Sequence, residues 1–511
     1  PFADVDESVR YLESRCGRVS AITVVDDGEK FGVWPGTHGH VYGDGWLDRF
    51  FDRVLATSWL RMATFADVID GTRATDRVYL PTASYREMGE WALATPAGRR
   101  LVAARRALAQ CGDGSEFQDL LPGGFWRSFL VKYPEIGDTY WKMLRLSEAL
   151  QREAGQRPGD ERLDQARTQL LRGQANDAYW HGVFGGCYLP HLRRAVKQSL
   201  LAAERLLAET SAAPAVAWTR GDVNGDGREE ILIRTPALAV TLNPALGGAV
   251  TELGAFEYGL DLADVLARRP ETYHDRLRAR TGEAGTGGGV HTIHAPPTAK
   301  EAGLEAFLEY DDLRRASLLD GLFEGEEPLD PVAPWRAARV VLGRMALAAS
   351  VQAEDGGVTA RFTLPAGAAA PFRVAKRVRV RDADVEARYT IGGPEAAPGG
   401  RRWAVQWNLA LTAGDGAGRY FDLPGRPPLR SRGQRSDLDG VTLVDEWLGL
   451  EARLQWRPAA EVRWGPVETV SISEAGFERI YQGTAFLIVW VLPAVSSGQW
   501  EMTTALGVRP R

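Results

Sequence analysis

The sequence has few cysteines and no long apolar run, and these two absences exclude several classes of protein. Its three cysteines, Cys16, Cys111 and Cys187, stand far apart in 511 residues, so the disulfide framework of a small secreted domain is not expected. Free thiols fit a reducing compartment, and the cytoplasm is therefore the expected location. No stretch approaches the roughly 18 consecutive apolar residues of a membrane-spanning helix, so no membrane partner is expected.

An excess of positive charge is also lacking. The formal net charge is -6, whereas a protein that binds a polyphosphate needs a basic face, so no nucleic-acid partner is expected. Hydrophobic residues make up 44%, charged residues 25%, and there are 16 tryptophans, which is typical of a folded globular protein. The length predicts two or three domains.

The period of the apolar residues changes along the chain. A helical pattern over residues 9–16 and a short β-branched run over residues 20–25 predict one β/α unit in residues 1–45. Helical periodicity dominates residues 46–210. After the proline-containing segment 210–215, runs of strand length separated by Gly/Pro clusters predict a large antiparallel β-sandwich over residues 216–511.

The segment "VVDDGEKFGVW" places two aspartates where the first apolar run ends. Side chains alternate across a strand, so Asp26 and Asp27 are expected to point to opposite sides, with only one of them facing a cleft. A carboxylate followed by Gly28 and, a few residues later, by Trp34 offers a proton donor and a flat face for a sugar ring. An ordinary aspartate-glycine turn is the alternative.

Several long strings give the chain a family resemblance. It resembles the 4-α-glucanotransferases and α-amylases of glycoside hydrolase family 57 over most of its length. The strings that carry the resemblance occur in the same order as in that family, and they are "VVDDGEKFGVWPGT", "YLPTASYREMGEWAL", "GGFWRSFLVKYPE", "ANDAYWHGVFGGCYLPHLR", "NPALGGAVTELGAFEYGLDLADVLARRPETYH" and "EYDDLRRAS".

The resemblance implies an α+β multidomain fold: a remnant of a (β/α)7 barrel, a helical region that completes the catalytic domain, and a galactose-mutarotase-like β-sandwich. It also implies a retaining mechanism with a glutamate nucleophile and an aspartate general acid/base. Asp27 matches that aspartate, which would need a pKa raised towards the working pH. Asp26 would then be structural, and Glu29 and Trp34 would border the sugar site.

The nucleophile that the resemblance implies is not found. In the family it lies well upstream of the aspartate motif, and only 26 residues precede Asp27 here. A retaining enzyme needs two carboxyl groups about 5 to 5.5 Å apart, which Asp26 cannot provide as a sequence neighbour. We therefore expect an N-terminally incomplete sequence that does not catalyse alone. Glu87 or Glu90 could approach the cleft instead, although their spacing of three also fits an ordinary helix face.

Two further segments contain candidate sugar contacts. In "NDAYWHG", Asp177 and Trp180 match a family segment near the active site, whereas without the family a capping Asp177 and a core Trp180 are the better reading. After "WPGT" the family has an aromatic-acidic-aromatic string where this chain has His38, Gly39 and His40. His40 is expected to make at most a weak sugar contact. Transfer of the glucan to a sugar acceptor is therefore less strongly predicted than hydrolysis.

One segment resembles half of a calcium loop. In "DVNGDGREE", the oxygen-bearing Asp222, Asn224 and Asp226 alternate before Gly227, as in the first half of an EF-hand loop. The glutamate expected at the twelfth position is Ile233, so a Ca2+ site would need other ligands. A turn that enters the first strand explains the pattern equally well.

The predicted function is the C-terminal portion of a retaining α-1,4-glucan-processing glycosidase or 4-α-glucanotransferase. The expected partners are α-1,4-glucans and maltooligosaccharides, a homodimer is left open, and no organic cofactor is implied. The alternative is a non-catalytic glucan-binding or scaffold protein.

Overall fold

A computed structural model describes most of the chain and divides it into two compact units. The first unit holds residues 1–82, 283–300 and 474–476, and the second unit holds 83–282, 301–473 and 477–511. The described residues are 4–34, 36–73, 76–80, 82–112, 114, 117–183, 186–210, 214–279, 299–365, 373–392, 401–473, 476–492 and 499–511.

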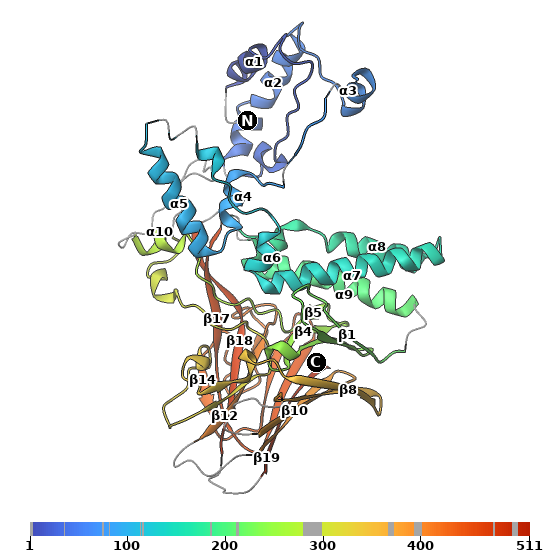
Figure 1. Ribbon diagram of the computed structural model, residues 1–511, viewed down its shortest axis with the longest axis vertical. Coiled ribbons are helices and arrows are strands. Elements are labelled where there is room, and N and C mark those ends of the chain that lie inside the picture. The colour runs from blue at the N-terminus through green and yellow to red at the C-terminus, as the bar shows by residue number, and fades with distance from the viewer. Residues whose placement is uncertain are drawn as a thin grey trace. The chain divides into compact units, whose positions relative to one another are not determined.

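Short helices make up the regular structure of the first unit (Figure 1). The helix α1 begins after Asp4, whose side chain accepts a hydrogen bond from the Asp6 N–H at 2.9 Å. The helix α3 begins with a capping box between Thr64 and Asp67, which satisfies two N–H groups that have no partner inside the helix. The elements are α1 (Val5–Glu13), a 3-10 turn (Gly28–Phe31), a π-helical turn (Gly39–Gly43), α2 (Trp46–Leu55) and α3 (Phe65–Gly71).

The strand expected over residues 20–25 is not formed, and that prediction is wrong. Residues 21–27 have no regular secondary structure, and the side chains of Val24 and Val25 are 79% and 85% exposed. A strand is stable only when neighbouring strands satisfy its N–H and C=O groups. No described residue of the first unit pairs with this segment, so its β-branched composition alone does not make it a strand.

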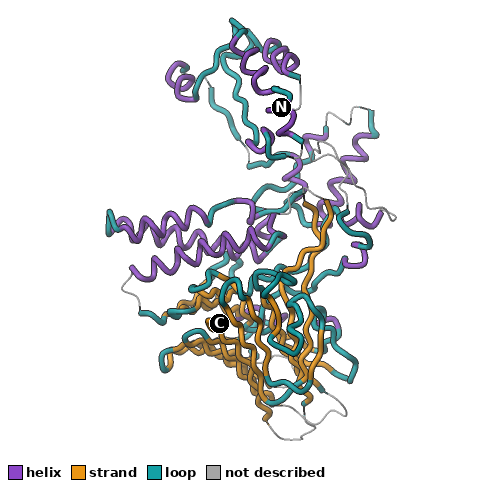
Figure 2. The backbone as a smooth tube through the Cα atoms, turned by 180° about the vertical axis from the view of Figure 1, so that it is seen from behind, coloured by secondary structure: helices purple, strands orange, loops and turns teal. Residues whose placement is uncertain are grey.

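The helical part of the second unit is built around three long helices that lie side by side (Figures 1 and 2). Buried side chains of α7, α8 and α9 share one core with Phe129 and Tyr133. The helix α7 begins with Pro134, which has the fixed φ that suits a first helical turn. The helices are α4 (Arg86–Trp91), α5 (Thr95–Ala109), α6 (Ser128–Lys132), α7 (Pro134–Gln156), α8 (Glu161–Arg172), α9 (Pro190–Thr210) and α10 (His274–Ala279).

The strands of the second unit form three sheets, ordered β1-β2-β3-β4-β5, β13-β15-β16-β19-β11-β10-β9-β8 and β14-β17-β18-β12-β6-β7. The strands are β1 (Ala217–Gly221), β2 (Glu230–Arg234), β3 (Leu238–Asn243), β4 (Ala249–Ala255), β5 (Leu260–Asp261), β6 (Leu319–Phe323), β7 (Val340–Val341), β8 (Ala348–Glu354), β9 (Gly357–Thr363), β10 (Arg373–Arg381), β11 (Asp384–Gly392), β12 (Arg402–Leu409), β13 (Arg419–Phe421), β14 (Gly433–Arg435), β15 (Gly440–Asp445), β16 (Leu450–Arg457), β17 (Glu461–Ser473), β18 (Gly476–Val491) and β19 (Gln499–Pro510).

The predicted antiparallel β-sandwich is confirmed. Long strands such as β12 and β18 pair antiparallel, with Trp407 opposite Phe486, and the inner faces bury one large core. Four tryptophans are at most 1% exposed, namely Trp403, Trp407, Trp456 and Trp490. Each tryptophan removes a large apolar area from water, which stabilises the packed sheets.

The helical region ends where the change of period predicts. Helix α9 ends at Thr210 and strand β1 begins at Ala217. Part of the intervening segment lies outside the described residues, and the domain limits at residues 45 and 216 stay predictions.

Candidate functional site

Asp27 and Trp34 border one short loop of the first unit. The 3-10 turn Gly28–Phe31 follows Asp27 directly, and Gly32 has a φ of 139°, a conformation that favours glycine. The chain therefore reverses within a few residues. The reversal brings Lys30 Nζ to 2.5 Å from Asp26 Oδ1 and 3.4 Å from Asp27 Oδ2.

The two aspartates share Lys30 but differ in exposure. Asp26 and Asp27 were expected to point apart, and that prediction is wrong because the segment is not a strand and both carboxylates reach the same ammonium. Burial alone would raise the pKa of Asp26, but hydrogen bonds from Lys30 and from the Asp27 N–H outweigh it and lower the pKa below 3.8. Asp27 is 65% exposed, so its carboxylate is open to a ligand.

The other residues predicted around Asp27 stay near the surface. Glu29 is exposed, and Trp34 is half-buried with its ring centroid 5.4 Å from Lys30 Nζ. An ammonium at this distance attracts the face of an indole, which fixes the ring beside the loop. His40 Nδ1 lies 3.7 Å from Asp44 Oδ2. This loop thus gathers Asp27, Lys30 and Trp34, while the roles predicted for these residues stay predictions.

Asp177 and Trp180 lie in the second unit and differ from each other. Asp177 sits exposed on the 3-10 turn Asn176–Tyr179. Trp180 is only 9% exposed, donates its indole N–H to Asn176 Oδ1 at 2.9 Å, and stacks on Trp91 with ring centroids 6.0 Å apart. Trp180 therefore packs in the helical core, as its alternative interpretation predicted.

A buried carboxylate that the sequence reasoning missed lies beneath this segment. Glu271 is 2% exposed. Its Oε1 accepts hydrogen bonds from the hydroxyls of Tyr133 at 2.6 Å and Tyr188 at 2.9 Å, and its Oε2 accepts one from Lys132 Nζ at 2.8 Å. Burial alone would raise the pKa of Glu271, but the charge of Lys132 and these hydrogen bonds hold it below 4.5.

Backbone and ring contacts connect the Glu271 cluster to Trp180. The ring of His181 lies 4.5 Å from that of Tyr188, and its Nε2 is 2.8 Å from the hydroxyl of Tyr273. The Cys187 N–H donates to the Trp180 carbonyl at 2.8 Å. Because each polar group here is both buried and paired, this region holds the Trp180 backbone in one conformation.

The signal for Glu271 was present in the sequence. The three strings "GGFWRSFLVKYPE", "ANDAYWHGVFGGCYLPHLR" and "VLARRPETYH" supply Lys132 with Tyr133, His181 with Tyr188, and Glu271 with Tyr273. None of the three strings by itself indicates that its residues share a cluster with the others. Only the fold brings them together, because they lie far apart in sequence.

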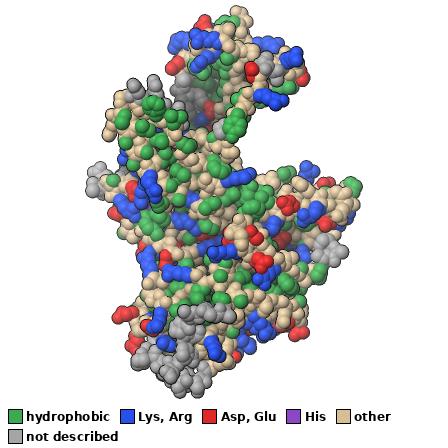
Figure 3. All heavy atoms as spheres, viewed as in Figure 1, with side chains coloured by type: hydrophobic (Ala, Val, Ile, Leu, Met, Phe, Trp, Pro, Cys, Tyr) green, Lys and Arg blue, Asp and Glu red, His purple; other side chains and the backbone are tan. Residues whose placement is uncertain are grey.

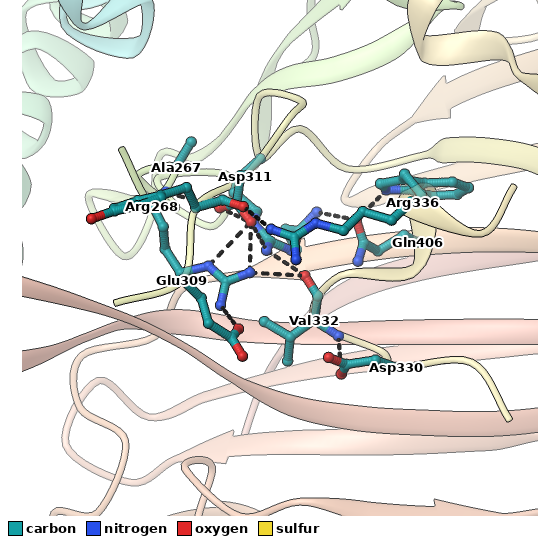
Figure 4. Close-up of polar contacts among 12 residues, drawn as sticks. Ala267, Arg268, Glu309, Asp311, Asp330, Val332, Arg336 and Gln406 are labelled. Atoms are coloured by element: carbon teal, nitrogen blue, oxygen red, sulfur yellow. Dashed lines mark hydrogen bonds and ion pairs between the residues drawn. The ribbon is translucent and has the colours of Figure 1, made fainter. Parts of the chain in front are cut away.

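The segment that contains Glu271 is held to the sandwich by a second buried cluster (Figure 4). The Arg268 guanidinium donates to Asp311 Oδ1 at 2.7 Å and to Glu309 Oε2 at 2.5 Å. Burial would raise the pKa of Asp311, but the charges of Arg315 and Arg268 lower it to about 2. Both arginines also donate to the Val332 carbonyl. This cluster fixes the path of the chain on either side of residues 280–298.

The alternative catalytic carboxylates, Glu87 and Glu90, lie on the short helix α4. The Glu90 carboxylate accepts a hydrogen bond from the Arg105 guanidinium, which also donates to the Leu121 carbonyl at 3.1 Å. Glu90 is therefore engaged in helix packing, as expected for an ordinary helix face.

The calcium candidate folds as a closed turn. Asp222 accepts hydrogen bonds from the N–H groups of Gly225, Asp226 and Gly227 at 2.8, 3.2 and 3.0 Å, and Asn224 accepts one from Asp226 at 3.1 Å. Over the described ranges, no group of three or more His, Cys, Asp or Glu side chains is arranged to hold a metal ion. A Ca2+ site on Asp222, Asn224 and Asp226 stays a prediction.

The charges of the second unit are mixed rather than segregated. Figure 3 shows Lys and Arg side chains interspersed with Asp and Glu side chains over the visible face of the sandwich, and many of them form ion pairs, such as Arg344 with Asp312. None of the helices in the described ranges is both long and apolar enough to cross a membrane.

Comparisons with known proteins cover both units. The family model described as "Alpha-amylase/4-alpha-glucanotransferase, C-terminal" matches residues 222–504, and the corresponding middle-domain model matches residues 124–207. "Alpha-amylase 1" of Dictyoglomus thermophilum is 32% identical and is matched over 100% of this chain and 73% of its own length. The 4-α-glucanotransferase of Thermococcus kodakarensis is 34% identical, with coverages of 96% and 69%.

The solved structure of one relative agrees with the sequence matches. The crystal structure of 4-α-glucanotransferase from Thermococcus litoralis superposes with a TM-score of 0.76 at 28% identity, covering 99% of this chain and 71% of that one. A galactose mutarotase-like protein from Clostridium acetobutylicum covers 58% of this chain with a TM-score of 0.35 and 7% identity.

Proposed function

Because the chain belongs to the α-amylase/4-α-glucanotransferase family, we propose that it processes α-1,4-glucans with retention of the anomeric configuration and that Asp27 is its general acid/base. The observation that carries this proposal is the contrast at the Asp27 loop. Lys30 Nζ lies 2.5 Å from Asp26 Oδ1 but 3.4 Å from Asp27 Oδ2, and Asp27 keeps a largely exposed carboxyl on the loop whose Lys30 also contacts the Trp34 ring.

In this role Asp27 acts twice. Its protonated carboxyl donates to the glycosidic oxygen as the bond to the anomeric carbon breaks, and its carboxylate then removes a proton from the incoming hydroxyl or water. Trp34 offers a stacking face to a neighbouring glucose ring, and Glu29 and His40 accept or donate hydrogen bonds at its rim. The histidine at position 40 gives less apolar stacking area than a Tyr, Phe or Trp ring would, which favours water over a sugar as the acceptor.

We further propose that the residues described by the structure hold the acid/base but not the nucleophile. Retention requires a second carboxylate about 5 to 5.5 Å from the first. In the first unit the carboxylate that contacts the same loop is that of Asp26, which Lys30 engages. The segment that was expected to form a barrel strand has no regular secondary structure, and Val24 and Val25 are exposed. These observations support a site that is completed by residues other than those of the loop.

Asp177 and Trp180 are proposed as further glucan contacts. The support is that Asp177 is exposed while Ala178 and Tyr179, which follow it on the same turn, are buried, and the Tyr179 hydroxyl donates to the Gly173 carbonyl at 2.6 Å. A carboxylate on a fixed backbone is well suited to bind a sugar hydroxyl, because little conformational entropy is lost.

The test is incubation of the chain with maltooligosaccharides and separation of the products by length. The expected result is no new chain length, together with retardation by glycogen in a native gel that weakens in Asp27→Ala and is unchanged in the matched Asp52→Ala, which removes an exposed aspartate of α2. New chain lengths would contradict the missing nucleophile, and their loss in Asp27→Asn would still support the acid/base role. Glycogen retardation with no effect of either variant would favour a non-catalytic glucan-binding protein. Absence of both products and retardation would contradict glucan processing.

A further inference from the structure

A polar cleft of about 350 Å³ lies within the second unit, apart from the segments discussed above. It is formed by the beginning of α9, the chain after β5, the loop after β12, and the first half of β18. This volume falls within the roughly 300 to 1,000 Å³ of small-molecule sites. The family resemblance implies no role for the residues that line this cleft.

The charges that line the cleft balance one another. Four basic and four acidic side chains line it, and most of them are paired. Lys197 Nζ lies 2.7 Å from Asp261 and 3.0 Å from Asp264. Arg430 binds Asp415 at 3.1 Å. A cleft with balanced and paired charges gains little from a charged ligand but offers many donors and acceptors to a neutral one.

Two polar groups of the cleft retain unused hydrogen-bonding capacity. Gln482 is 2% exposed and donates its amide N–H groups to the Tyr188 carbonyl and Thr469 Oγ1, both at 2.8 Å. Its Oε1 is buried and accepts no hydrogen bond from the part of the chain that is described. Arg194 is half-buried in the lining and forms no ion pair with any described residue. An unsatisfied buried acceptor is costly, and a ligand hydroxyl that reaches Gln482 would supply the missing donor.

The remaining surface of the cleft suits the less polar faces of a sugar. Leu260, Leu411, Ile480 and the half-buried Tyr481 contribute apolar atoms between the polar groups. His191 at the rim has its pKa lowered by burial and by nearby arginines, so it offers one donor and one acceptor as a neutral ring at pH 7.

We propose that this cleft is a non-catalytic binding site for one or two glucose units of an α-glucan, with Arg194 and Gln482 as its principal hydrogen-bonding groups. The identity of the ligand rests on the proposed function, whereas the preference for a neutral polyhydroxyl compound rests on the lining alone. A second site of this kind would hold a long glucan to the protein while another part of the chain is processed, through a raised effective concentration.

The experiment is hydrogen–deuterium exchange of the full chain with and without maltotriose, read by peptide. The expected result is slower exchange in residues 189–197, 410–415 and 478–482. Arg194→Ala should raise the Kd for this protection about tenfold, since it removes a charged hydrogen-bond donor, and Ala413→Trp should abolish the protection by filling the cleft. The matched control is Arg205→Ala, which removes an exposed arginine of the same helix that pairs with Glu209 and should leave the Kd unchanged.

Three results would overturn the proposal. Protection confined to residues 24–34 or 176–181 would contradict a site in the cleft and would leave the proposed glucan processing intact. Protection of the cleft segments that persists with the same Kd in both Arg194→Ala and Ala413→Trp would also contradict it. A lack of protection anywhere would contradict this site, and together with absent products and absent glycogen retardation it would contradict the proposed function as well.

Discussion

The two units of this chain use similar residues in opposite ways. In the first unit many apolar side chains face solvent, including Val25, Leu55 and Phe65 at 85%, 81% and 70% exposure, and the ion pairs of the Asp27 loop join neighbours three and four residues apart. In the second unit the apolar side chains form large cores, and buried ion pairs such as Lys132 with Glu271 join residues distant in sequence. Composition alone does not decide where stability resides.

The largest expected effect comes from breaking a buried ion pair of the second unit. In Lys132→Met the Glu271 carboxylate stays buried without its cation, which should lower the free energy of unfolding by about 3 to 5 kcal/mol. The matched change in the first unit, Lys30→Met, should cost less than about 1 kcal/mol because that pair is exposed. Urea denaturation of both variants measures the difference, and equal effects would contradict the comparison.

Two phenylalanines offer an equivalent test for apolar packing. Phe129 is 0% exposed in the helical core, so Phe129→Ala should destabilise the second unit by about 3 to 5 kcal/mol. Phe65 is the exposed first residue of α3, and Phe65→Ala should change the free energy of unfolding by less than about 0.5 kcal/mol. Midpoints of denaturant unfolding report both values. A large loss in Phe65→Ala would indicate that the first unit buries this ring in solution.

Two carboxyl groups, Glu230 in the second unit and Asp26 in the first, should contribute to the pH dependence of stability with opposite signs. Burial raises the pKa of Glu230 from 4.5 to about 7. A raised carboxyl pKa means that the folded state holds the proton more tightly, so this group disfavours folding increasingly as pH rises from 4.5 to 7, by about 3 kcal/mol in total. The lowered pKa of Asp26 contributes stability above pH 3.8 that is lost as pH falls.

Glu230→Gln tests the pH dependence that Glu230 contributes. The test uses only the change with pH in the stability difference between wild type and variant, so the absolute stability of the variant does not matter. The difference in the free energy of unfolding between wild type and variant should shift by about 2 to 3 kcal/mol in favour of the variant between pH 5 and pH 8. Asp26→Asn should show no such gain over this range. A pH-independent difference for Glu230→Gln would mean that the Glu230 pKa is not raised.

The smallest expected effects concern helix caps. The Asp160 side chain accepts a hydrogen bond from the Arg162 N–H at 3.0 Å at the beginning of α8, and Asp160→Ala should cost about 1 kcal/mol of global stability. Thr64→Ala removes the capping box of α3 and should speed amide exchange within that helix alone, because α3 has no buried residues to couple it to a core. Exchange measured by mass spectrometry separates a global from a local effect.

Particular residues show what could be predicted from the sequence. The strand period of residues 216–511 identified the β-sandwich, because alternating burial on many strands leaves a pattern that needs no knowledge of partners. The quoted strings identified the family. For Trp180 the sequence left two interpretations open, a core position and a sugar contact, because a buried tryptophan and a sugar-binding tryptophan look the same in sequence.

The sequence by itself determined the change from helices to strands near residue 210, the family and the candidate acid Asp27, because periodicity and contiguous motifs are local properties. Only the tertiary structure decided that residues 20–25 are not a strand, that Asp26 and Asp27 share Lys30, and that three distant strings meet at Glu271. The first and the last of these outcomes depend on hydrogen-bond partners and on low-dielectric surroundings that residues distant in sequence supply. The Lys30 contacts depend on the turn that the backbone makes directly after Asp27.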